Sequence, residues 1–368
     1  MKTRVISLLL AAVFFMPRPF CAHADGAPPT SAGSAVMIEA ETGEVLYEKH
    51  SNKAMLIAST TKIMTALIVL ENCVVSETVK IKPEWTNVEG SSMYLKEDEE
   101  LSVKELLYGL MLGSGNDAAV ALACHTAGSI ESFSKLMNER AKSLGLIATS
   151  FKNPHGLDED GHFSTAGDLA VITREAMKND VFCKIVATKS IVAGGRELKN
   201  HNRLLWDCDG VIGVKTGYTK SAGRILVTCA KRDGMKLICV TISDPNDWAD
   251  HTSLYEWAFA AFTYKDVIPC ELKELALPVI SGEKEAVMVA AERDFPLLSG
   301  QSDKIEVIAE LPRFVYAEVV KGNVAGRLSV YKGGEFLGSI NYLYSVDVKR
   351  DDSQLLNYKQ RLFRMIFG

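Results

Sequence analysis

The sequence predicts an α+β domain with an antiparallel sheet and a helical cluster, followed by a smaller C-terminal all-β sandwich domain. Strand patterns at both ends of residues 25–264 enclose a run of helical patterns, which is typical of an α+β domain. After Pro269, short β-rich runs separated by Gly, Pro and Asn follow one another over residues 270–350, as in a small sandwich. At 368 residues the chain is long enough for both domains.

The N-terminal segment has the layout of a secretory signal peptide. Lys2 and Arg4 precede an apolar run over residues 5–16, and Ala22-His23-Ala24 offers small residues at a cleavage site. The apolar run is too short and wrongly flanked for a membrane span. We therefore expect residues 1–24 to be removed and the protein to be secreted and extracytoplasmic.

The elements of residues 25–264 follow from their periodicity. A hairpin is predicted over residues 35–49, around a turn at Glu41-Thr42-Gly43. A helix is predicted from about Ser59, because apolar residues recur on one face of the segment that follows. The further expected helices cover residues 103–111, 118–127, 130–144, 165–178 and 250–262, and the expected strands cover residues 213–216, 224–230 and 236–243.

The C-terminal part carries no obvious chemistry and is interpreted as a spacer or support. Its expected strands cover residues 285–291, 304–310, 314–320, 326–331 and 335–348. In residues 351–368, apolar side chains share one helical face with cations nearby. This pattern predicts an amphipathic tail that lies on a membrane surface; a helix docked on the protein's own surface is the alternative.

The charge of the chain argues against a nucleic-acid partner. Residues 1–24 contain three of the 41 basic residues and none of the 46 acidic ones. The remaining chain therefore has 38 basic and 46 acidic residues, a net charge of −8. No fold-wide nucleic-acid role is expected from such a balance.

The cysteines and histidines do not form a recognisable ligand pattern. Seven cysteines follow residue 24, and most lie in apolar segments, as Cys229 and Cys239 do. We interpret them as buried thiols and not as a disulfide framework. There is no CxxC or HExxH motif, and the close pair His155 and His162 lacks a carboxylate ligand pattern. The sequence predicts no metal site and no cofactor.

Ser59-Thr60-Thr61-Lys62 is the main candidate for chemistry. If Ser59 begins a helix, Lys62 lies one turn further on and on the same side, within reach of the hydroxyl. A plain helix cap is the alternative, but a cap prefers Glu or Gln at the third position. A cation in the first turn opposes the helix dipole. That conflict is resolved if Lys62 is neutral and accepts the proton of Ser59.

The order of two further motifs distinguishes Ser59 from other serines. The pattern S-x-x-K occurs four times, and alone it indicates little. Ser114-Gly115-Asn116 lies 55 residues after Ser59, and Lys215-Thr216-Gly217 lies 101 residues after Ser114. Only Ser59 has both motifs downstream in this order, with a domain's length of chain between them. The ordered set is typical of β-lactamases and penicillin-binding proteins.

At these residues the chain resembles the low-molecular-mass penicillin-binding proteins, the serine D-alanyl-D-alanine carboxypeptidases of the S11 peptidase type. The resemblance covers essentially the whole chain after residue 24, including the β-rich second domain and the basic tail, and implies a β-lactamase/transpeptidase-like catalytic fold. The strings that carry it are Ala58 to Ala66, Gly113 to Ala119, Asn153 to Leu157, Ser164 to Ala166, Asn202 to Leu205 and Gly213 to Thr219.

The resemblance implies a role for each motif residue. Ser59 would attack the penultimate D-alanine carbonyl while Lys62 takes its proton, and Ser114 would pass a proton to the leaving D-alanine. Asn116 would hold the peptide amide, and Lys215 and Thr216, followed by Gly217, would bind the terminal carboxylate. The backbone N–H groups of Ser59 and Tyr218 would form the oxyanion hole. Water would then hydrolyse the acyl-enzyme.

The implied partners are peptidoglycan stem peptides ending in D-Ala-D-Ala, with β-lactams as inhibitors that acylate Ser59. Some relatives carry His in place of Tyr218. The backbone N–H of Tyr218 can still serve the oxyanion hole, but the resemblance implies no role for its side chain in deacylation.

Two other functions compete with this interpretation. A class A β-lactamase needs a deacylating Glu in an E-x-x-L-N loop, and here Glu175-Ala-Met-Lys-Asn179 has Lys in place of Leu, within a predicted helix. We interpret Glu175 as a solvated helix residue. A non-catalytic wall-binding protein would have lost Ser59, Lys62 or Lys215, and all three are present.

Overall fold

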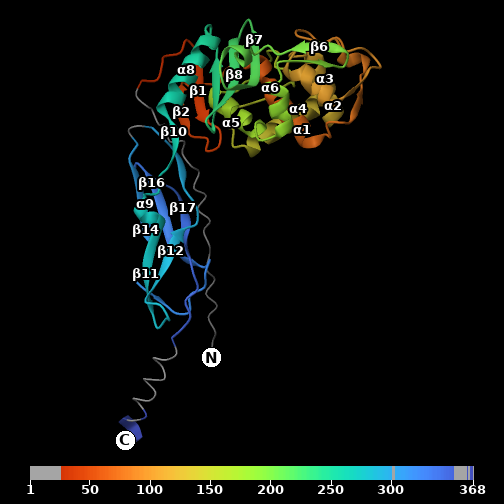
Figure 1. Cartoon of the computed structure of the whole chain (residues 1–368). Helices are drawn as coiled ribbons and strands as arrows, with labels where there is room; N and C mark the ends of the chain where they lie inside the picture. Colours follow the sequence, from red (N-terminus) through yellow and green to blue (C-terminus); the bar gives the residue numbers. More distant parts are fainter. Residues whose placement is uncertain (1–25, 301–302, 352–362, 364, 368) are drawn as a thin grey trace, which may run out of the picture. The chain divides into compact units, whose positions relative to one another are not determined.

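The chain folds into two compact units, which divide after Phe259 (Figure 1). The computed structural model describes residues 26–300, 303–351, 363 and 365–367. The predicted signal peptide and most of the predicted tail lie outside the described residues. The first unit combines a sheet with helices, and the second consists mainly of strands, so the α+β prediction is confirmed.

The first unit is built on a five-stranded antiparallel sheet in the order β2-β1-β9-β8-β7. The N-terminal hairpin joins the C-terminal meander because β1 pairs with both β2 and β9. This leaves β7, which carries the Lys215 motif, at the edge of the sheet. The strands are β1 (Ser34–Glu39), β2 (Val45–Lys49), β7 (Val211–Thr219), β8 (Gly223–Arg232) and β9 (Met235–Ile242).

Both faces of this sheet are buried, which explains the nearly continuous apolar runs of its central strands. Helix α5 (Ala166–Ala176) packs against β1, β8 and β9, and Val227 contributes to the same core cluster. The next side chain, Thr228, points to the opposite face, where it contacts His251 of α8 (Asp247–Ala261). Helices α5 and α8 therefore cover opposite faces, and α6 also packs against β7.

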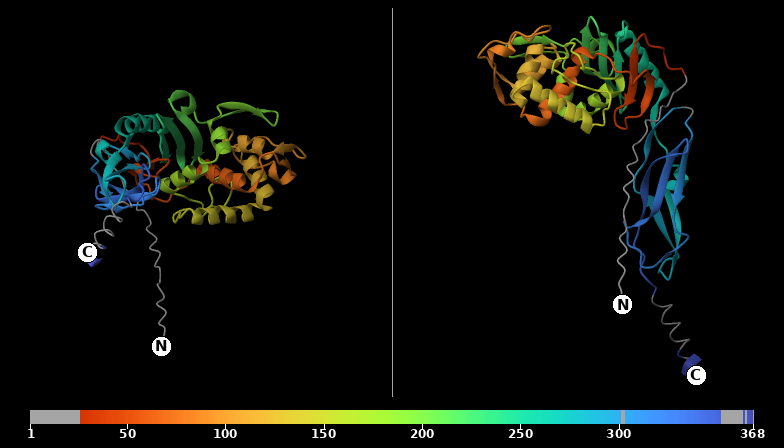
Figure 2. Two further views of the ribbon diagram at one scale, coloured as in Figure 1. Left: turned by 60° about the horizontal axis from the view of Figure 1, so that its bottom comes forward. Right: turned by 180° about the vertical axis from the view of Figure 1, so that it is seen from behind.

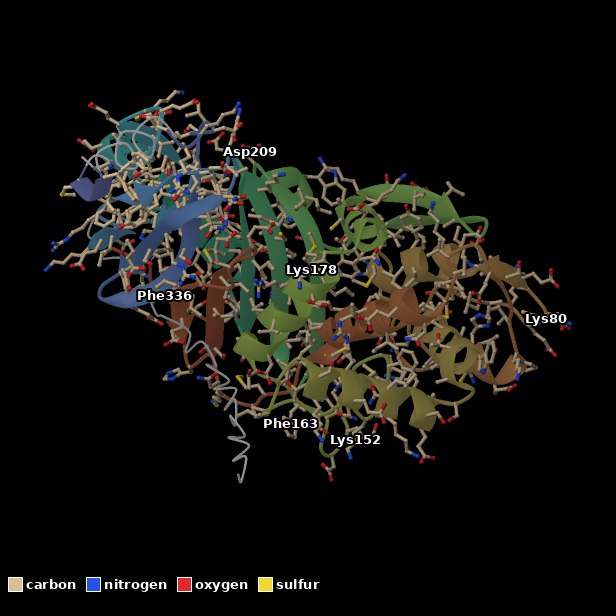
Figure 3. All side chains as sticks on the ribbon, turned by 90° about the horizontal axis from the view of Figure 1, so that it is seen from below. Lys80, Lys152, Phe163, Lys178, Asp209 and Phe336 are labelled. Carbon is tan, nitrogen blue, oxygen red and sulfur yellow. The ribbon has the colours of Figure 1, made fainter. Side chains whose placement is uncertain are left out.

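The other helices gather to one side of the sheet, as the views in Figures 1 and 2 show. Two short hairpins extend this region, and one of them carries Lys80 at the end farthest from the sheet (Figure 3). The helices are α1 (Lys62–Asn72), α2 (Val103–Met111), α3 (Asn116–Ala127), α4 (Ile130–Ser143), α6 (Asp180–Ala187) and α7 (Leu204–Asp207); the hairpins are β3 (Thr78–Lys80) with β4 (Glu100–Ser102) and β5 (Ser190–Ala193) with β6 (Arg196–Lys199).

The start of the first predicted helix differs from the expectation. Ser59 lies in a 3₁₀ turn, η1 (Ala58–Thr61), and the α-helix begins only at Lys62. A second difference is α6, which the sequence did not predict and which Asn179 caps by accepting bonds from Val181 N and Phe182 N. The cap begins α6 directly after the helix predicted over residues 165–178, so α6 is an additional helix.

The second unit contains a six-stranded sheet in the order β14-β16-β17-β12-β11-β15 and a two-stranded sheet of β10 and β13. Its core has its own cluster of buried residues, among them Val289, Leu328 and Tyr342. The expected strand over residues 314–320 is reduced to two residues. The strands are β10 (Thr263–Asp266), β11 (Glu274–Ile280), β12 (Ala286–Ala291), β13 (Pro296–Ser299), β14 (Ile305–Glu310), β15 (Val315–Tyr316), β16 (Val324–Lys332) and β17 (Glu335–Tyr344), and α9 covers Cys270–Lys273.

The predicted tail is described only at Phe363 and residues 365–367, which are helical and exposed. Among the described residues, no helix has both the length and the apolar character needed to cross a membrane.

Candidate active site

The turn η1 and the first residue of α1 place a hydroxyl beside a buried amine. Lys62 Nζ lies 2.9 Å from Ser59 Oγ. Lys62 is fully buried, whereas Ser59 is half-buried and lines a cavity of about 460 Å³. The hydroxyl is thus open to a ligand from one side and in contact with the amine on the other.

Two further contacts define the state of that amine. Lys62 Nζ donates to Asn116 Oδ1 at 2.7 Å and to the carbonyl of His155 at 2.7 Å. Burial and the neighbouring charge of Lys215 lower the pKa of Lys62 well below its ordinary value, and Asp117 opposes this shift. A neutral amine has two hydrogens for these two acceptors, so its lone pair remains for the proton of Ser59.

The Ser114 motif covers the end of the turn after α2 and the first residue of α3, Asn116. The residue after the motif, Asp117, holds this turn in place. Asp117 accepts bonds from Met93 N at 2.8 Å, Leu95 N at 3.0 Å and Ser92 Oγ at 2.7 Å. The carboxylate therefore fixes the loop over residues 91–95 against the start of α3. Our sequence reasoning gave Asp117 no role, although an acidic residue in a first helical turn is a signal for such contacts.

Ser114, in the turn, and Asn116, at the start of α3, have different surroundings. Ser114 lines the cavity and has a left-handed backbone, with φ of 58°. Asn116 is 3% exposed. Its Oδ1 accepts from Lys62, and its Nδ2 donates to the carbonyl of Glu89 at 2.6 Å.

The loop of residues 153–157 brings the His155 carbonyl to Lys62. Asn153 Oδ1 accepts from Gly156 N at 2.7 Å, and Thr65 Oγ1 donates to Pro154 O at 2.6 Å. Gly156 has φ of +89°, and a Cβ there would lie 1.9 Å from the carbonyl oxygen of Ala58. Only glycine fits this approach of the loop to η1.

The edge strand β7 forms the opposite wall of the cavity through Thr216, Gly217 and Tyr218. A Cβ on Gly217 would lie 3.3 Å from Ser59 N, so this strand packs closely on η1. Lys215 is fully buried and donates to Thr216 O at 2.8 Å; burial lowers its pKa to about 7. The side chain of Tyr218 is 65% exposed.

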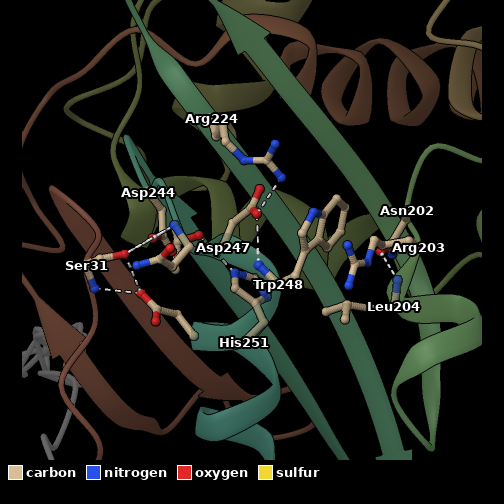
Figure 4. Close-up of polar contacts among 12 residues, drawn as sticks. Ser31, Asn202, Arg203, Leu204, Arg224, Asp244, Asp247, Trp248 and His251 are labelled. Carbon is tan, nitrogen blue, oxygen red and sulfur yellow. Dashed lines mark hydrogen bonds and ion pairs between the residues drawn. The ribbon is translucent and has the colours of Figure 1, made fainter.

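Several cavity residues were missed by the sequence reasoning. Arg224 is ion-paired with Asp247 at 2.6 Å, and its guanidinium lies 5.5 Å from the ring centre of Trp248 (Figure 4). Arg224 faces Tyr218 across the β7–β8 pairing, so the register of the predicted meander could have indicated it. The cavity residues without a predicted role are Ser91, His201, Arg224, Ile225, Asp247 and Trp248.

The residue that a class A β-lactamase would need is engaged in ion pairs. Glu175, on α5, contacts Arg140 through Oε1 at 2.9 Å and Lys178 through Oε2 at 2.6 Å. These contacts lower the pKa of its carboxyl group, with the Lys178 bond as the largest cause. Glu175 therefore stabilises the α4–α5 contact as an ion-paired helix residue.

Two models of known families match the chain. The family model described as D-alanyl-D-alanine carboxypeptidase, peptidase family S11, matches residues 21–246. This chain belongs to that family. In this S11 chain the motif residues described above all fall within the matched range. A second model, the C-terminal domain of penicillin-binding protein 5, matches residues 265–350.

Relatives of this S11 chain match both units. D-alanyl-D-alanine carboxypeptidase DacF of Bacillus subtilis is 34% identical and covers 94% of this chain and 95% of its own. DacC of Escherichia coli, with the same description, is 33% identical and covers 87% and 85%. The solved structure of penicillin binding protein 5 from Haemophilus influenzae has a TM-score of 0.69 at 28% identity, covering 88% of this chain and 99% of that one.

Proposed function

We propose that this chain is a serine carboxypeptidase that removes the terminal D-alanine from peptidoglycan stem peptides ending in D-Ala-D-Ala. The observation that carries the proposal is the 2.9 Å contact between Ser59 Oγ and the buried amine of Lys62, at the wall of a cavity. Family membership supports it, because the matched relatives are named for this activity.

The first step forms the acyl-enzyme. Lys62 accepts the hydroxyl proton while Ser59 Oγ bonds to the carbonyl carbon of the penultimate D-alanine. The backbone N–H groups of Ser59 and Tyr218 are proposed to hold the oxyanion, and the close packing of Gly217 on Ser59 N supports this placement. A β-lactam would acylate Ser59 by the same route.

Collapse of the tetrahedral species releases the leaving group. The bond to the nitrogen of the terminal D-alanine breaks, and that nitrogen takes the proton held by Lys62, passed on through Ser114. Asn116 is proposed to orient Lys62 through the 2.7 Å contact. A contact between Asn116 and the substrate amide stays a prediction.

The carboxylate of the terminal D-alanine is proposed to bind beside Thr216 and the charge of Lys215. A protonated Lys215 attracts the anion and also keeps Lys62 neutral, since its charge lowers the pKa of Lys62. The Arg224 guanidinium also lies on the cavity wall, where its ion pair with Asp247 offsets its charge. Water then attacks the acyl-enzyme, gives its proton to Lys62 and restores the Ser59 hydroxyl.

We further propose an extracytoplasmic location with peripheral attachment to a membrane surface. The apolar run over residues 5–16 and the basic amphipathic pattern of residues 351–368 support it. The exposed apolar side chains of Phe363 and residues 365–367 fit the same interpretation.

The activity is tested by incubating the purified protein with a D-Ala-D-Ala peptide and following free D-alanine. We expect D-alanine release by the wild type and none by Ser59→Ala. Rapid turnover of a penicillin without D-alanine release would instead indicate a β-lactamase. The absence of both reactions in the wild type would indicate a non-catalytic binding protein.

A further inference from the structure

A thiol, a carboxylate and an imidazole meet at the end of α1 opposite the catalytic serine. Cys73 follows the last residue of α1, Glu77 comes four residues later, and His125 lies in the last turn of α3. One ligand atom from each lies within 4.8 Å of the other two. We propose that Cys73, Glu77 and His125 form a binding site for a zinc-like divalent transition-metal ion.

The spacing of the three groups is close to what one ion requires. Ligand atoms at about 2.0–2.3 Å from a tetrahedral zinc ion lie roughly 3.3–3.8 Å apart. His125 Nε2 and Glu77 Oε2 are already 3.1 Å apart. The Cys73 sulfur lies within 4.8 Å of the other two ligand atoms, so binding would draw it about 1 Å closer. The fourth position is left for water.

The ligand types select the class of metal. Thiolate and imidazole are ligands for Zn²⁺ and its neighbours, whereas Ca²⁺ and Mg²⁺ prefer sets made only of oxygen. Seen from the sequence, the three residues form no CxxC or HExxH motif, because His125 is 48 residues from Glu77 in the chain. The packing of α1 against α3 brings them together.

The neighbouring contacts hold the ligands in place. Glu77 Oε1 accepts from Val74 N at 2.6 Å, which turns Oε2 toward His125. Thr126 Oγ1 donates to Leu122 O at 2.7 Å and lies 3.3 Å from Cys73 Sγ. The Thr126 hydroxyl hydrogen is already donated to Leu122 O, so the Cys73 thiol is the donor in its contact with Thr126. A bound metal ion would replace the thiol proton of Cys73.

The site is partly open to solvent, so an ion can enter. The His125 and Glu77 side chains are 25% and 42% exposed. Eleven residues of α1 separate it from Ser59, about 16 Å at 1.5 Å per residue. The ion would therefore stabilise the contact of α1 with α3 and take no part in the acyl transfer.

The test is a titration of the untagged, reduced full chain with Co²⁺, followed through thiolate-to-cobalt absorption and then displaced with Zn²⁺. We expect one ion per chain and a rise of the melting temperature with Zn²⁺. Cys73→Ser should lose the absorption band. Glu77→Gln and His125→Gln should bind at least about tenfold more weakly, since loss of even an outer partner costs 10–100-fold.

Cys183→Ser is the matched control, because Cys183 is also partly buried and its sulfur donates to a backbone carbonyl, that of Met177. It should keep the band and the affinity. Penicillin labelling of Ser59 in every variant verifies folding. A wild-type chain without the band, or a Cys73→Ser variant that retains it, would overturn the proposal and leave Glu77 and His125 as a surface ion pair.

Discussion

The protonation state of Lys62 depends on a balance of named neighbours. Burial and Lys215 favour the neutral amine, and Asp117 favours the charged one. The motif order predicted that Lys62 and Ser59 act together. It did not predict the His155 carbonyl as a partner, because a backbone acceptor can come from any residue and has no sequence signature.

Replacement of Asp117 tests this balance. Asp117→Asn removes the charge that raises the pKa of Lys62, so Lys62 loses its proton at lower pH. We expect the acidic limb of the kcat/KM profile to shift to lower pH. The free energy of unfolding of the variant should also be lower by about 1–3 kcal/mol, because a backbone N–H of residues 91–95 loses its acceptor. An unchanged acidic limb would contradict the account; Ser92→Ala, which keeps the charge, is the control.

The charge of Lys215 predicts the alkaline limb. Its pKa of about 7 means that Lys215 is neutral above that pH in the free enzyme. We expect kcat/KM for an anionic peptide to fall as pH rises through about 7, and the fall in kcat to come at higher pH, since bound carboxylate stabilises the cation. Lys215→Arg stays charged and should lose this fall. An unchanged alkaline limb in Lys215→Arg would argue against the assignment of this limb to deprotonation of Lys215.

At the scale of elements, the site depends on two close approaches to η1, from the loop at Gly156 and from β7 at Gly217. Periodicity predicted the long helices and the meander well. It missed the hairpins β3–β4 and β5–β6, because strands of three or four residues carry too little pattern. It also could not predict that η1 precedes α1, since loop and strand contacts fix that turn.

Gly217→Ala tests the approach of β7. The new Cβ would lie 3.3 Å from Ser59 N and Ile57 O, so strand and turn must separate by a few tenths of an ångström. We expect penicillin acylation to slow roughly tenfold, because small misplacements of reacting groups are costly, with little change of melting temperature. A Cβ on Gly33 would lie 3.4–3.5 Å from its nearest neighbours, none of which belongs to η1. Gly33→Ala should therefore be acylated at the normal rate. Equal rates in both variants would refute the proposed packing effect.

At the scale of the molecule, two units have separate cores, and the predicted chemistry belongs entirely to the first. The second unit was predictable from the sequence, because short β-rich runs separated by turn residues begin after Pro269. Its sheet order was not predictable, because β11 and β15 pair in parallel across 35 residues of chain.

Leu328→Ala tests the independence of the two units. Leu328 is fully buried in the second core, so the substitution should cost about 2–5 kcal/mol. We expect calorimetry to show a lower transition for the second unit and unchanged penicillin labelling at 25 °C. Leu106→Ala, at a buried site of the first core, should lower the other transition. Loss of labelling in Leu328→Ala would show that the units are not independent.

The most direct test of the account is peptide mapping by mass spectrometry after brief exposure to penicillin. We expect one adduct per chain, on the peptide that contains Ser59, and no adduct in Ser59→Ala or in Lys62→Met. An adduct on another serine, or one that persists in Ser59→Ala, would contradict the assignment of Ser59 as the nucleophile.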